Sequence, residues 1–444
     1  MKPNAILITL FFLLLHLHAA GLPAAPVNSS PGRPTPGQAA LSSGSQGIAE
    51  AVFLNDLVEE ALRNNRDIRA AQRKYEASRQ RPSQSSTLPD PLLSFSSNNI
   101  GNPVPITTLG EEDMSMTGFD LMQELPFPGK LLLKGKMAQK DADSDWHGYR
   151  GVELQVVSEV KQAFYRLRFV HQTLDVVEKN KDLLDKFARI AEALYAVGKG
   201  IQQDVLRAQV ELTALEKKRI ELEQQRGSLE AKIVSLLNRP PESPLGRPAD
   251  SAKARLSASL DELYQAVRSQ APVLGQEQAM IEKNTYALDL ARKDYYPDFA
   301  VGAGWFSRGG LRDLWSLRFD VKVPLYFWRK QRSAVAESAH TLEQSRREYE
   351  ATTQTLHYRI KDDYLMAKAS EQLMELYSQA IIPQITLALE SAMASYQVGT
   401  LDFLSLLTNF QQLLDYEVEY HKEFAGFHEA LVRLEATSGR RLLE

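Results

Sequence analysis

Cysteine is absent from this 444-residue sequence. Its absence excludes disulfide bonds, zinc sites built on thiolates, thiol catalysis and a lipid-bearing cysteine after a signal peptide. An excess of one charge is absent as well, because 52 Lys and Arg residues stand against 56 Asp and Glu residues, a net charge of −4. The sequence shows no polybasic segment of the kind that predicts binding to nucleic acid. If a membrane holds this protein, we expect its own fold to be the anchor.

Long apolar runs are missing after the N-terminus. There, Lys2 precedes an apolar stretch from Ala5 to Leu17, and small residues follow up to Ala25. This order predicts a secretory signal peptide over residues 1–25. The apolar stretch is shorter than the ~20 residues that a membrane-spanning helix needs. Any later insertion into a membrane would therefore use strands.

Catalytic signatures are missing too. The sequence has no phosphate-binding glycine loop with Lys-Ser/Thr and no Gly-x-Ser-x-Gly elbow. His428-Glu429 lacks the second histidine of a zinc-protease helix, and Gly302-x-Gly304 falls in a predicted strand instead of a strand-to-helix turn. We therefore predict that the protein is not an enzyme and has no cofactor or metal site.

An internal repeat organises the chain after a Pro-, Ser- and Gly-rich lead-in at residues 26–47, whose composition is typical of a flexible segment. Leu54 to Ile68 matches Leu260 to Leu274 in its apolar positions, and each copy leads to a Pro-Asp pair. Those pairs are Pro89-Asp90 and Pro297-Asp298. The predicted units are a first repeat at 48–241, a linker at 242–258 and a second repeat at 259–440.

Each repeat contains two segments that predict a β-hairpin, at about 91–125 and at 298–324. Apolar and polar residues alternate strictly from Leu314 to Val323, and the pattern returns from Phe299 to Phe306. The first hairpin is predicted from Leu92 to Asn98 and from Ser115 to Leu125. Strands of this length and alternation are typical of outer-membrane barrels, although a soluble hairpin packed on a helix is the alternative. The predicted membrane-facing residues are Trp315, Leu317, Phe319, Val321, Phe299, Val301 and Trp305.

Four strands cannot close a barrel, because about eight are the minimum. Self-association is therefore expected, and three copies would supply twelve strands.

Very long helices come after each hairpin. Lys130 to Ala196 would measure about 100 Å as a helix, and its apolar residues recur with the spacing of a helix-packing seam. A return helix is predicted from Ile201 to Asn238, and the second repeat has the same pair from Arg329 to Gln397 and from Asp402 to Thr437.

Three motifs carry a family resemblance: the strand exit from Gln123 to Lys130, the turn from Tyr195 to Leu206 and the turn from Tyr396 to Leu404. Together with the order of elements from about residue 50 to residue 440, they resemble the TolC-like outer membrane efflux proteins. The resemblance implies a mostly α-helical homotrimer. Its single twelve-stranded β-barrel would lie in the outer membrane and continue as a long periplasmic α-helical barrel.

The resemblance also implies a function, a location and partners. The protein would be the passive exit duct of a tripartite efflux system, in contact with outer-membrane lipid, a periplasmic adaptor (membrane fusion) protein and a proton-driven inner-membrane pump. The sequences after the turns look most like the heavy-metal branch, so the expected cargo is heavy-metal cations. Drug efflux and type I protein secretion are alternatives within the family. A periplasmic coiled-coil adaptor or scaffold without a pore is the rival outside it.

The resemblance assigns roles to a few residues. The adaptor would dock on the helix-turn tips, which depart from the commonest Val-Gly-Thr-Arg pattern. Glu390 is predicted to lie on the apolar seam of its helix and to form a periplasmic gate as a ring of three carboxylates, with an exposed surface glutamate as the alternative. Pro383 is predicted to kink the same helix. The tip residues are Val197, Gly198, Lys199, Gly200, Val398, Gly399, Thr400 and Leu401.

Overall fold

The computed structural model describes residues 51–250 and 254–442. The predicted signal peptide, the lead-in and residues 251–253 of the predicted linker lie outside these ranges. The elements of the first repeat are α2 (Leu54–Asn64), α3 (Arg66–Ser78), α4 (Arg81–Ser86), β1 (Leu92–Asn98), β2 (Met116–Leu125), α5 (Lys130–Ala196) and α6 (Gln202–Leu236). Those of the second are α7 (Leu260–Gln270), α8 (Pro272–Lys293), β3 (Asp298–Ser307), β4 (Leu314–Lys322), α9 (Lys330–Leu376), the π-helix η1 (Tyr377–Ile381), α10 (Ile382–Gln397) and α11 (Phe403–Ser438).

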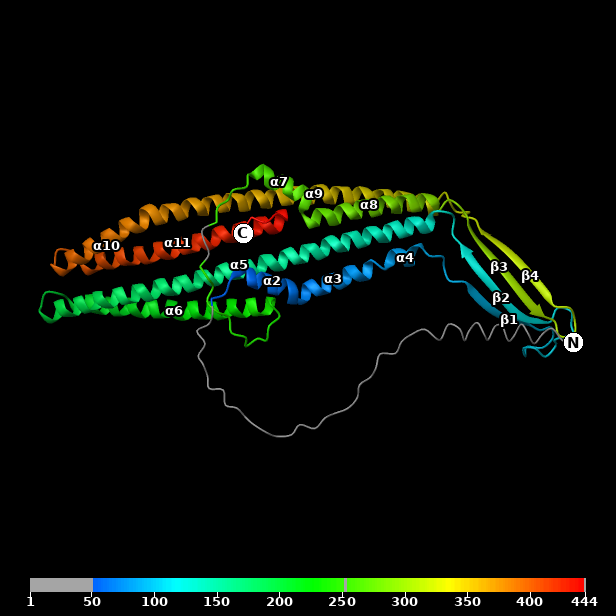
Figure 1. Cartoon of the computed structure of the whole chain (residues 1–444), viewed down its shortest axis with the longest axis horizontal. Helices are drawn as coiled ribbons and strands as arrows, with labels where there is room; N and C mark the ends of the chain where they lie inside the picture. The colour runs from blue at the N-terminus through cyan, green and yellow to red at the C-terminus, as the bar shows by residue number, and fades with distance from the viewer. Residues whose placement is uncertain (1–50, 251–253, 443–444) are drawn as a thin grey trace, which may run out of the picture. The chain divides into compact units, whose positions relative to one another are not determined.

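Both repeats place shorter helices before a β-hairpin and long helices after it (Figure 1). Each strand begins and ends within one residue of its predicted bounds, and α5 has the predicted bounds. Within the described residues, no helix combines the length and the apolar character that crossing a bilayer requires.

The helix α5 is the centre of the helical packing. It lies against α6 and α8 along much of its length and also contacts α2, α3, α4 and α11. Its seam residues alternate by three and four positions, and Leu167, Val170, Val177 and Leu184 are all buried, as a helix-packing seam requires. The shorter helices α3 and α4 both pack on α5 and cover part of it that α6 does not reach.

One predicted helix boundary is wrong by two residues. The return helix ends at Leu236 instead of Asn238, because Asn238 has a left-handed φ of 54° and Arg239 precedes a proline, which disfavours helix. The long helix of the second repeat runs from Lys330 to Gln397, within one residue of its predicted bounds, and includes the π-helix η1 between α9 and α10. Pro383 lies just after η1. It cannot donate the helical hydrogen bond to Gln379, so a wider π-turn just before it accommodates the missing donor.

The four strands form one antiparallel sheet in the order β1-β2-β3-β4. The pairing of β2 with β3 joins the two repeats, with Leu125 opposite Phe299 and Thr117 opposite Ser307. Within the described part of the chain, β1 and β4 are edge strands whose outer sides have no partner. Such edges are templates for pairing with another chain.

Candidate functional site

One face of the sheet is apolar and exposed. On β3 and β4, Trp305 lies opposite Trp315, Val301 opposite Phe319 and Phe299 opposite Val321. Residues directly opposite one another share a face of the sheet. All the predicted membrane-facing residues therefore point to the same side. Leu317 is 89% exposed and Trp315 is 74% exposed, whereas Phe299 is half-buried.

The apolar face continues across the whole sheet. Phe119 of β2 lies opposite both Trp305 of β3 and Phe95 of β1, and Leu121 lies opposite Leu93. The rings of Phe95 and Phe119 are 5.3 Å apart. No element among residues 51–250 and 254–442 covers this apolar surface, which spans four strands and is suited to contact with lipid or with another apolar surface.

The opposite face is mostly polar or small. Asp120, Gly304 and Ser316 form one row across β2, β3 and β4. The Arg318 guanidinium lies 3.1 Å from Asp320 and 3.8 Å from Asp120 on this side. A sheet with one apolar and one charged face is suited to a boundary between an apolar phase and water.

The predicted tips are two helix ends with the same backbone geometry. At the first, the Lys199 N–H donates to the Leu194 carbonyl over 2.8 Å, and Gly198 has a φ of +74°. At the second, the Thr400 N–H donates to the Ser395 carbonyl over 3.0 Å, and Gly399 has a φ of +77°. This is the Schellman motif, in which glycine supplies the left-handed residue. Each tip is therefore a defined turn with little freedom to change direction.

The two tips differ at the start of the helix that leaves the turn. Asp402 caps α11 by accepting a 2.9 Å hydrogen bond from the Ser405 N–H, whereas Ile201 at the start of α6 has no side chain that caps the helix. Val197 is 68% exposed and Val398 is 75% exposed. Each tip therefore presents an exposed apolar side chain on a defined turn.

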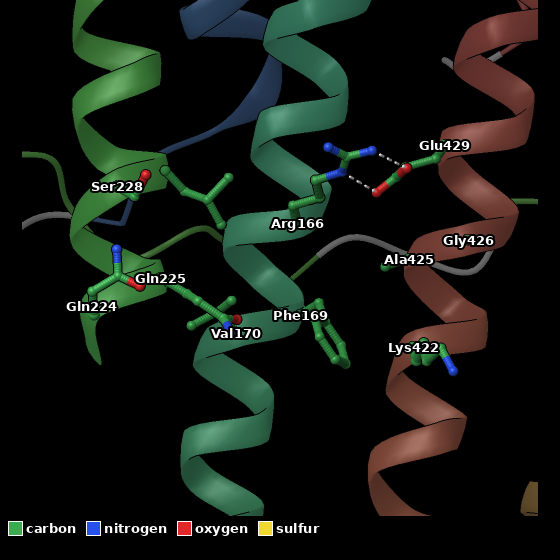
Figure 2. Close-up of a pocket in the computed structure, with 11 residues that line it drawn as sticks. Arg166, Phe169, Val170, Gln224, Gln225, Ser228, Lys422, Ala425, Gly426 and Glu429 are labelled. Atoms are coloured by element: carbon green, nitrogen blue, oxygen red, sulfur yellow. Dashed lines mark hydrogen bonds and ion pairs between the residues drawn. The ribbon is translucent and has the colours of Figure 1, made fainter. Parts of the chain in front are cut away.

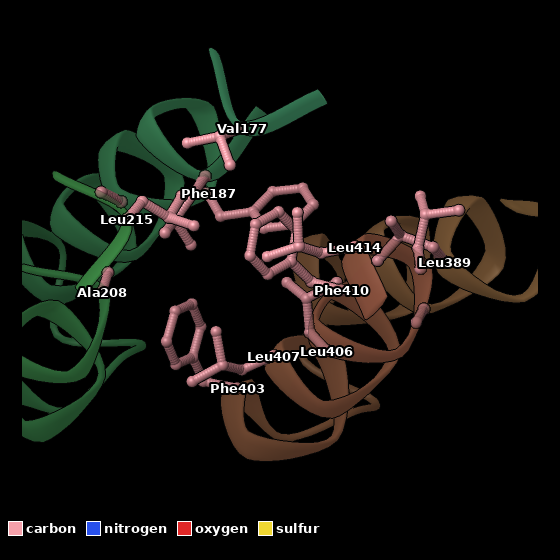
Figure 3. Packing of buried hydrophobic residues seen from close by; sticks show 14 of the residues in the cluster. Val177, Phe187, Ala208, Leu215, Leu389, Phe403, Leu406, Leu407, Phe410 and Leu414 are labelled. Atoms are coloured by element: carbon pink, nitrogen blue, oxygen red, sulfur yellow. The ribbon is translucent and has the colours of Figure 1, made fainter. Parts of the chain in front are cut away.

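A hydrophobic cluster holds the two helical hairpins together near the tips. Figure 3 shows Phe187 and Leu215 of the first hairpin facing Phe403, Phe410 and Leu414 of the second. The rings of Phe187 and Phe410 meet edge to face at 5.9 Å. Aromatic pairs of this kind contribute about 0.5–1.5 kcal/mol beyond the area they bury. The tips are thus tied to each other within one chain.

A polar contact lies beside this cluster. The Tyr396 hydroxyl donates to Asp204 over 3.3 Å. Burial, and then the neighbouring Asp204 carboxylate, raise the pKa of Tyr396 to about 12. Burial also raises the pKa of Asp204 above its ordinary value. Sequence reasoning missed this pair, although both residues lie within the quoted turn motifs.

Glu390 does not lie on the packed seam, and that prediction is wrong. The packed positions are Ile382, Ile385, Leu389 and Tyr396, spaced by three and four residues, and Glu390 itself is exposed. One residue corresponds to about 100° of rotation on a helix, so the carboxylate next to buried Leu389 points away from the partner helices. An exposed Glu390 faces solvent in the single chain.

A buried lysine sits where the sheet joins the helices. Lys130 is the first residue of α5 and only 6% exposed. Its Nζ lies 2.9 Å from Asp298 and 3.1 Å from Asp294, and Asp298 also accepts a 2.8 Å hydrogen bond from the Phe127 N–H. This contact connects the end of the first hairpin with the start of the second.

Two further ion pairs connect the repeats in the middle of the helices. Lys161 of α5 lies 2.5 Å from Glu435 of α11, and both side chains are almost fully buried. The Arg166 guanidinium makes a bidentate ion pair with the Glu429 carboxylate of α11, with Nε–Oε1 and Nη2–Oε2 distances of 2.8 and 3.0 Å. The second pair lines a groove of about 520 Å³ between α5, α6 and α11 (Figure 2). We assign these pairs a structural role, because they fasten the long helix of one repeat to the return helix of the other.

Sequence comparison places these features among known proteins. A family model described as outer membrane efflux protein matches residues 57–239 and 263–440. The probable outer membrane lipoprotein SilC of Salmonella typhimurium is 22% identical over 368 residues, which cover 79% of this chain and 78% of SilC. The cobalt-zinc-cadmium resistance protein CzcC of Cupriavidus metallidurans is 20% identical over 355 residues, which cover 77% of this chain and 82% of CzcC.

Structure comparison agrees on the fold. The crystal structure of CusC, reported with the formation of a transmembrane channel, superposes with a TM-score of 0.74 at 17% identity. The match covers 93% of this chain and 99% of CusC. The family match spans both repeats, each with its β-hairpin and its long helices, so it favours a channel over an adaptor without a pore.

Proposed function

Because this chain belongs to the outer membrane efflux protein family, we propose that three copies of it close into one exit duct across the outer membrane. Each copy is an outer-membrane efflux channel subunit that contributes four strands. A barrel needs about eight strands or more, and three copies supply twelve. The long helices of the three copies would continue the duct into the periplasm as a helical barrel.

The exposed apolar face of the sheet carries this proposal. In the single chain it leaves Leu317 and Trp315 open to solvent, a costly arrangement for side chains of this size. Contact with outer-membrane lipid would cover the face, and the charged face with Arg318 and Asp120 would then line the water-filled interior. The free edges of β1 and β4 would pair with neighbouring copies.

The tips are proposed to dock on a periplasmic adaptor protein, which couples the duct to an inner-membrane pump. The support is geometric: Val197 and Val398 are exposed on rigid turns at the ends of the helical hairpins. An adaptor would bury these apolar side chains and read the different residues beside them, Lys199 in one tip and Thr400 in the other.

Heavy-metal cations are the proposed cargo, and a proton-driven pump the proposed energy source. CzcC is named for resistance to cobalt, zinc and cadmium, and SilC and CzcC both align with most of this chain. Glu390 is proposed to contribute to a ring of three carboxylates, which becomes possible only when three copies surround a common axis. Such a ring would favour cations. Drug efflux and protein secretion are the alternatives for the cargo.

Two measurements test the proposal. Unheated outer-membrane extracts are expected to show a trimer band on a denaturing gel that converts to monomer on heating. A protein released from membranes by mild salt would overturn the channel assignment. A deletion strain is expected to lose tolerance to metals and regain it from a plasmid copy, whereas sensitivity to drugs alone would overturn the cargo assignment.

A further inference from the structure

The contact between the two repeats contains a buried lysine paired with two aspartates. Where β2 pairs with β3, the ammonium group of Lys130 lies within 3.1 Å of both Asp298 and Asp294. Lys130 is the first residue of α5, where the positive end of the helix dipole disfavours a cation. The two carboxylates offset that cost. The repeat interface therefore depends on an acidic residue at the start of one hairpin and a lysine at the exit of the other.

Because the chain is built as an internal repeat, it contains a second residue corresponding to the lysine of this contact and a second residue corresponding to the aspartate. Lys330 is the first residue of α9, as Lys130 is of α5, although it lies six residues after its exit proline, Pro324, and Lys130 lies four residues after Pro126. Asp90 follows Pro89 just before β1, as Asp298 follows Pro297 at the start of β3. In the single chain these second copies lie beside the two free edges of the sheet, β4 and β1.

In the part of the chain that the structure describes, Asp90 and Lys330 lack the ion pair that Asp298 and Lys130 form with each other. Asp90 and Lys330 are both exposed, and neither makes an ion pair or a side-chain hydrogen bond within residues 51–250 and 254–442. Lys330, like Lys130, places a positive charge at the N-terminal end of a helix, where the helix dipole disfavours it. Unlike Lys130, it has no carboxylate paired with it in the described residues. Within the described residues, both side chains are therefore available to pair with charged groups of another chain.

The apolar side chains around the contact show the same correspondence. Tyr296, two residues before Asp298, stacks on Phe127 with ring centres 4.5 Å apart. The corresponding residues are Leu88, two residues before Asp90, and Leu325, which comes directly after the exit proline as Phe127 does. Leu88 is 46% exposed and Leu325 is 65% exposed. The free edges thus carry an apolar pair as well as a charged pair.

We propose that Asp90 of one copy binds Lys330 of the neighbouring copy, with Leu88 packed on the neighbour's Leu325. The proposal rests on the proposed trimer and names the contact that closes it. The interface joins different surfaces of the two copies, head to tail, so the same contact repeats around the ring until the ring closes. Each copy would then hold its neighbour as its own two repeats hold each other.

Cysteine cross-linking tests this contact directly, because the natural chain has no cysteine. The double variant D90C/K330C is treated in membranes with a short bis-maleimide reagent and run on a denaturing gel after heating. We expect covalent dimers and trimers. The matched control is K130C/D298C, in which the link forms within one chain and leaves a monomer band. The single variant D90C is also expected to remain monomeric.

The outcomes separate this contact from the proposed function. If unheated wild-type protein migrates as a trimer and D90C/K330C gives only monomers, the contact is wrong and the trimeric duct stands. If the wild type shows no trimer, the proposed duct fails and the contact fails with it.

Charge reversal supplies the second test. D90K and K330D are each expected to lower the temperature at which trimers dissociate, and D90K/K330D is expected to restore it; three equal dissociation temperatures would overturn the contact.

Discussion

Tyr396 and Asp204 join the two helical hairpins near their tips through a 3.3 Å hydrogen bond. Tyr396 is 4% exposed, whereas Tyr195, which occupies the same position in the first tip motif, is 48% exposed. The repeat therefore uses one tyrosine as an internal tie and leaves the other on the surface. The two tips therefore differ in how they contact the other helical hairpin.

Replacing Tyr396 with Phe removes the tie and keeps the ring in the cluster. We expect Y396F to lower the stability of the tip packing by about 0.5–1.5 kcal/mol, the usual contribution of one hydrogen bond. Hydrogen exchange of the α6 and α10 amides should show faster opening at the tips. Y195F is the matched control and should leave exchange unchanged. Equal effects of the two substitutions would contradict the assigned tie.

The Asp204 carboxyl should make tip stability depend on pH. Burial raises its pKa above 3.8 in the folded protein, so the folded state binds its proton more tightly than the unfolded state does. Its contribution is therefore fully present below pH 3.8 and is lost as the pH rises through the raised pKa. In D204N this pH dependence should disappear, which can be measured as the difference between mutant and wild-type thermal midpoints from acid to neutral pH. A difference that stays constant with pH would show that Asp204 does not titrate in this way.

The strands could be predicted from the sequence because alternation is a local property. The side chains of Trp315, Leu317 and Phe319 stand on one face whatever the rest of the chain does. The rotation of a long helix is harder to predict. Glu390 neighbours Leu389, and only the packed partner helices show which of the two adjacent positions faces inward.

Contacts between repeats could not be predicted at all. Lys161 and Glu435 are separated by most of the chain, and their pairing depends on which helices are neighbours and on how each is rotated. Lys130 carried a weak signal, since a lysine at the first position of a helix is unfavourable without a nearby acid. Such a signal indicates that a partner exists but does not identify it.

The buried pair of Lys161 and Glu435 should respond differently to single and double substitution. K161M removes the lysine from the buried Glu435, which keeps a 2.6 Å hydrogen bond from the Leu442 N–H, and is expected to cost about 3–5 kcal/mol, whereas K161M/E435L should cost less. Thermal unfolding followed by circular dichroism measures both. The exposed pair of Arg189 and Asp185, on the same helix, is the control, and R189A should cost no more than about 0.5 kcal/mol. A single variant as stable as the double one would contradict the assigned burial.

Glu390 should act on permeation without acting on folding, because its side chain is exposed. If three copies bring three carboxylates together, E390A should weaken block of the channel by multivalent cations by about fivefold, since it removes on the order of 1 kcal/mol of attraction. Single-channel recording measures conductance and block. E192A removes an exposed glutamate from the other tip helix and should change neither. Unchanged block in E390A would exclude the carboxylate ring.

The sheet face gives the sharpest test of membrane insertion, because adjacent residues on one strand point to opposite sides. Leu317 belongs to the apolar face and Ser316 to the polar face. We expect L317K to place a charge in lipid at a cost of about 2–4 kcal/mol near the middle of the bilayer, repeated in every copy.

The readout is the amount of heat-modifiable trimer recovered from the outer membrane. L317K should reduce it severely, whereas S316K, which adds the same charge one residue away, should leave most of it intact. L317M keeps the apolar character and should behave as wild type. If S316K abolished the trimer and L317K did not, the two faces of the sheet would have to be exchanged, with the charged face of Arg318 and Asp320 turned toward lipid, an arrangement that leaves two ionised groups without water.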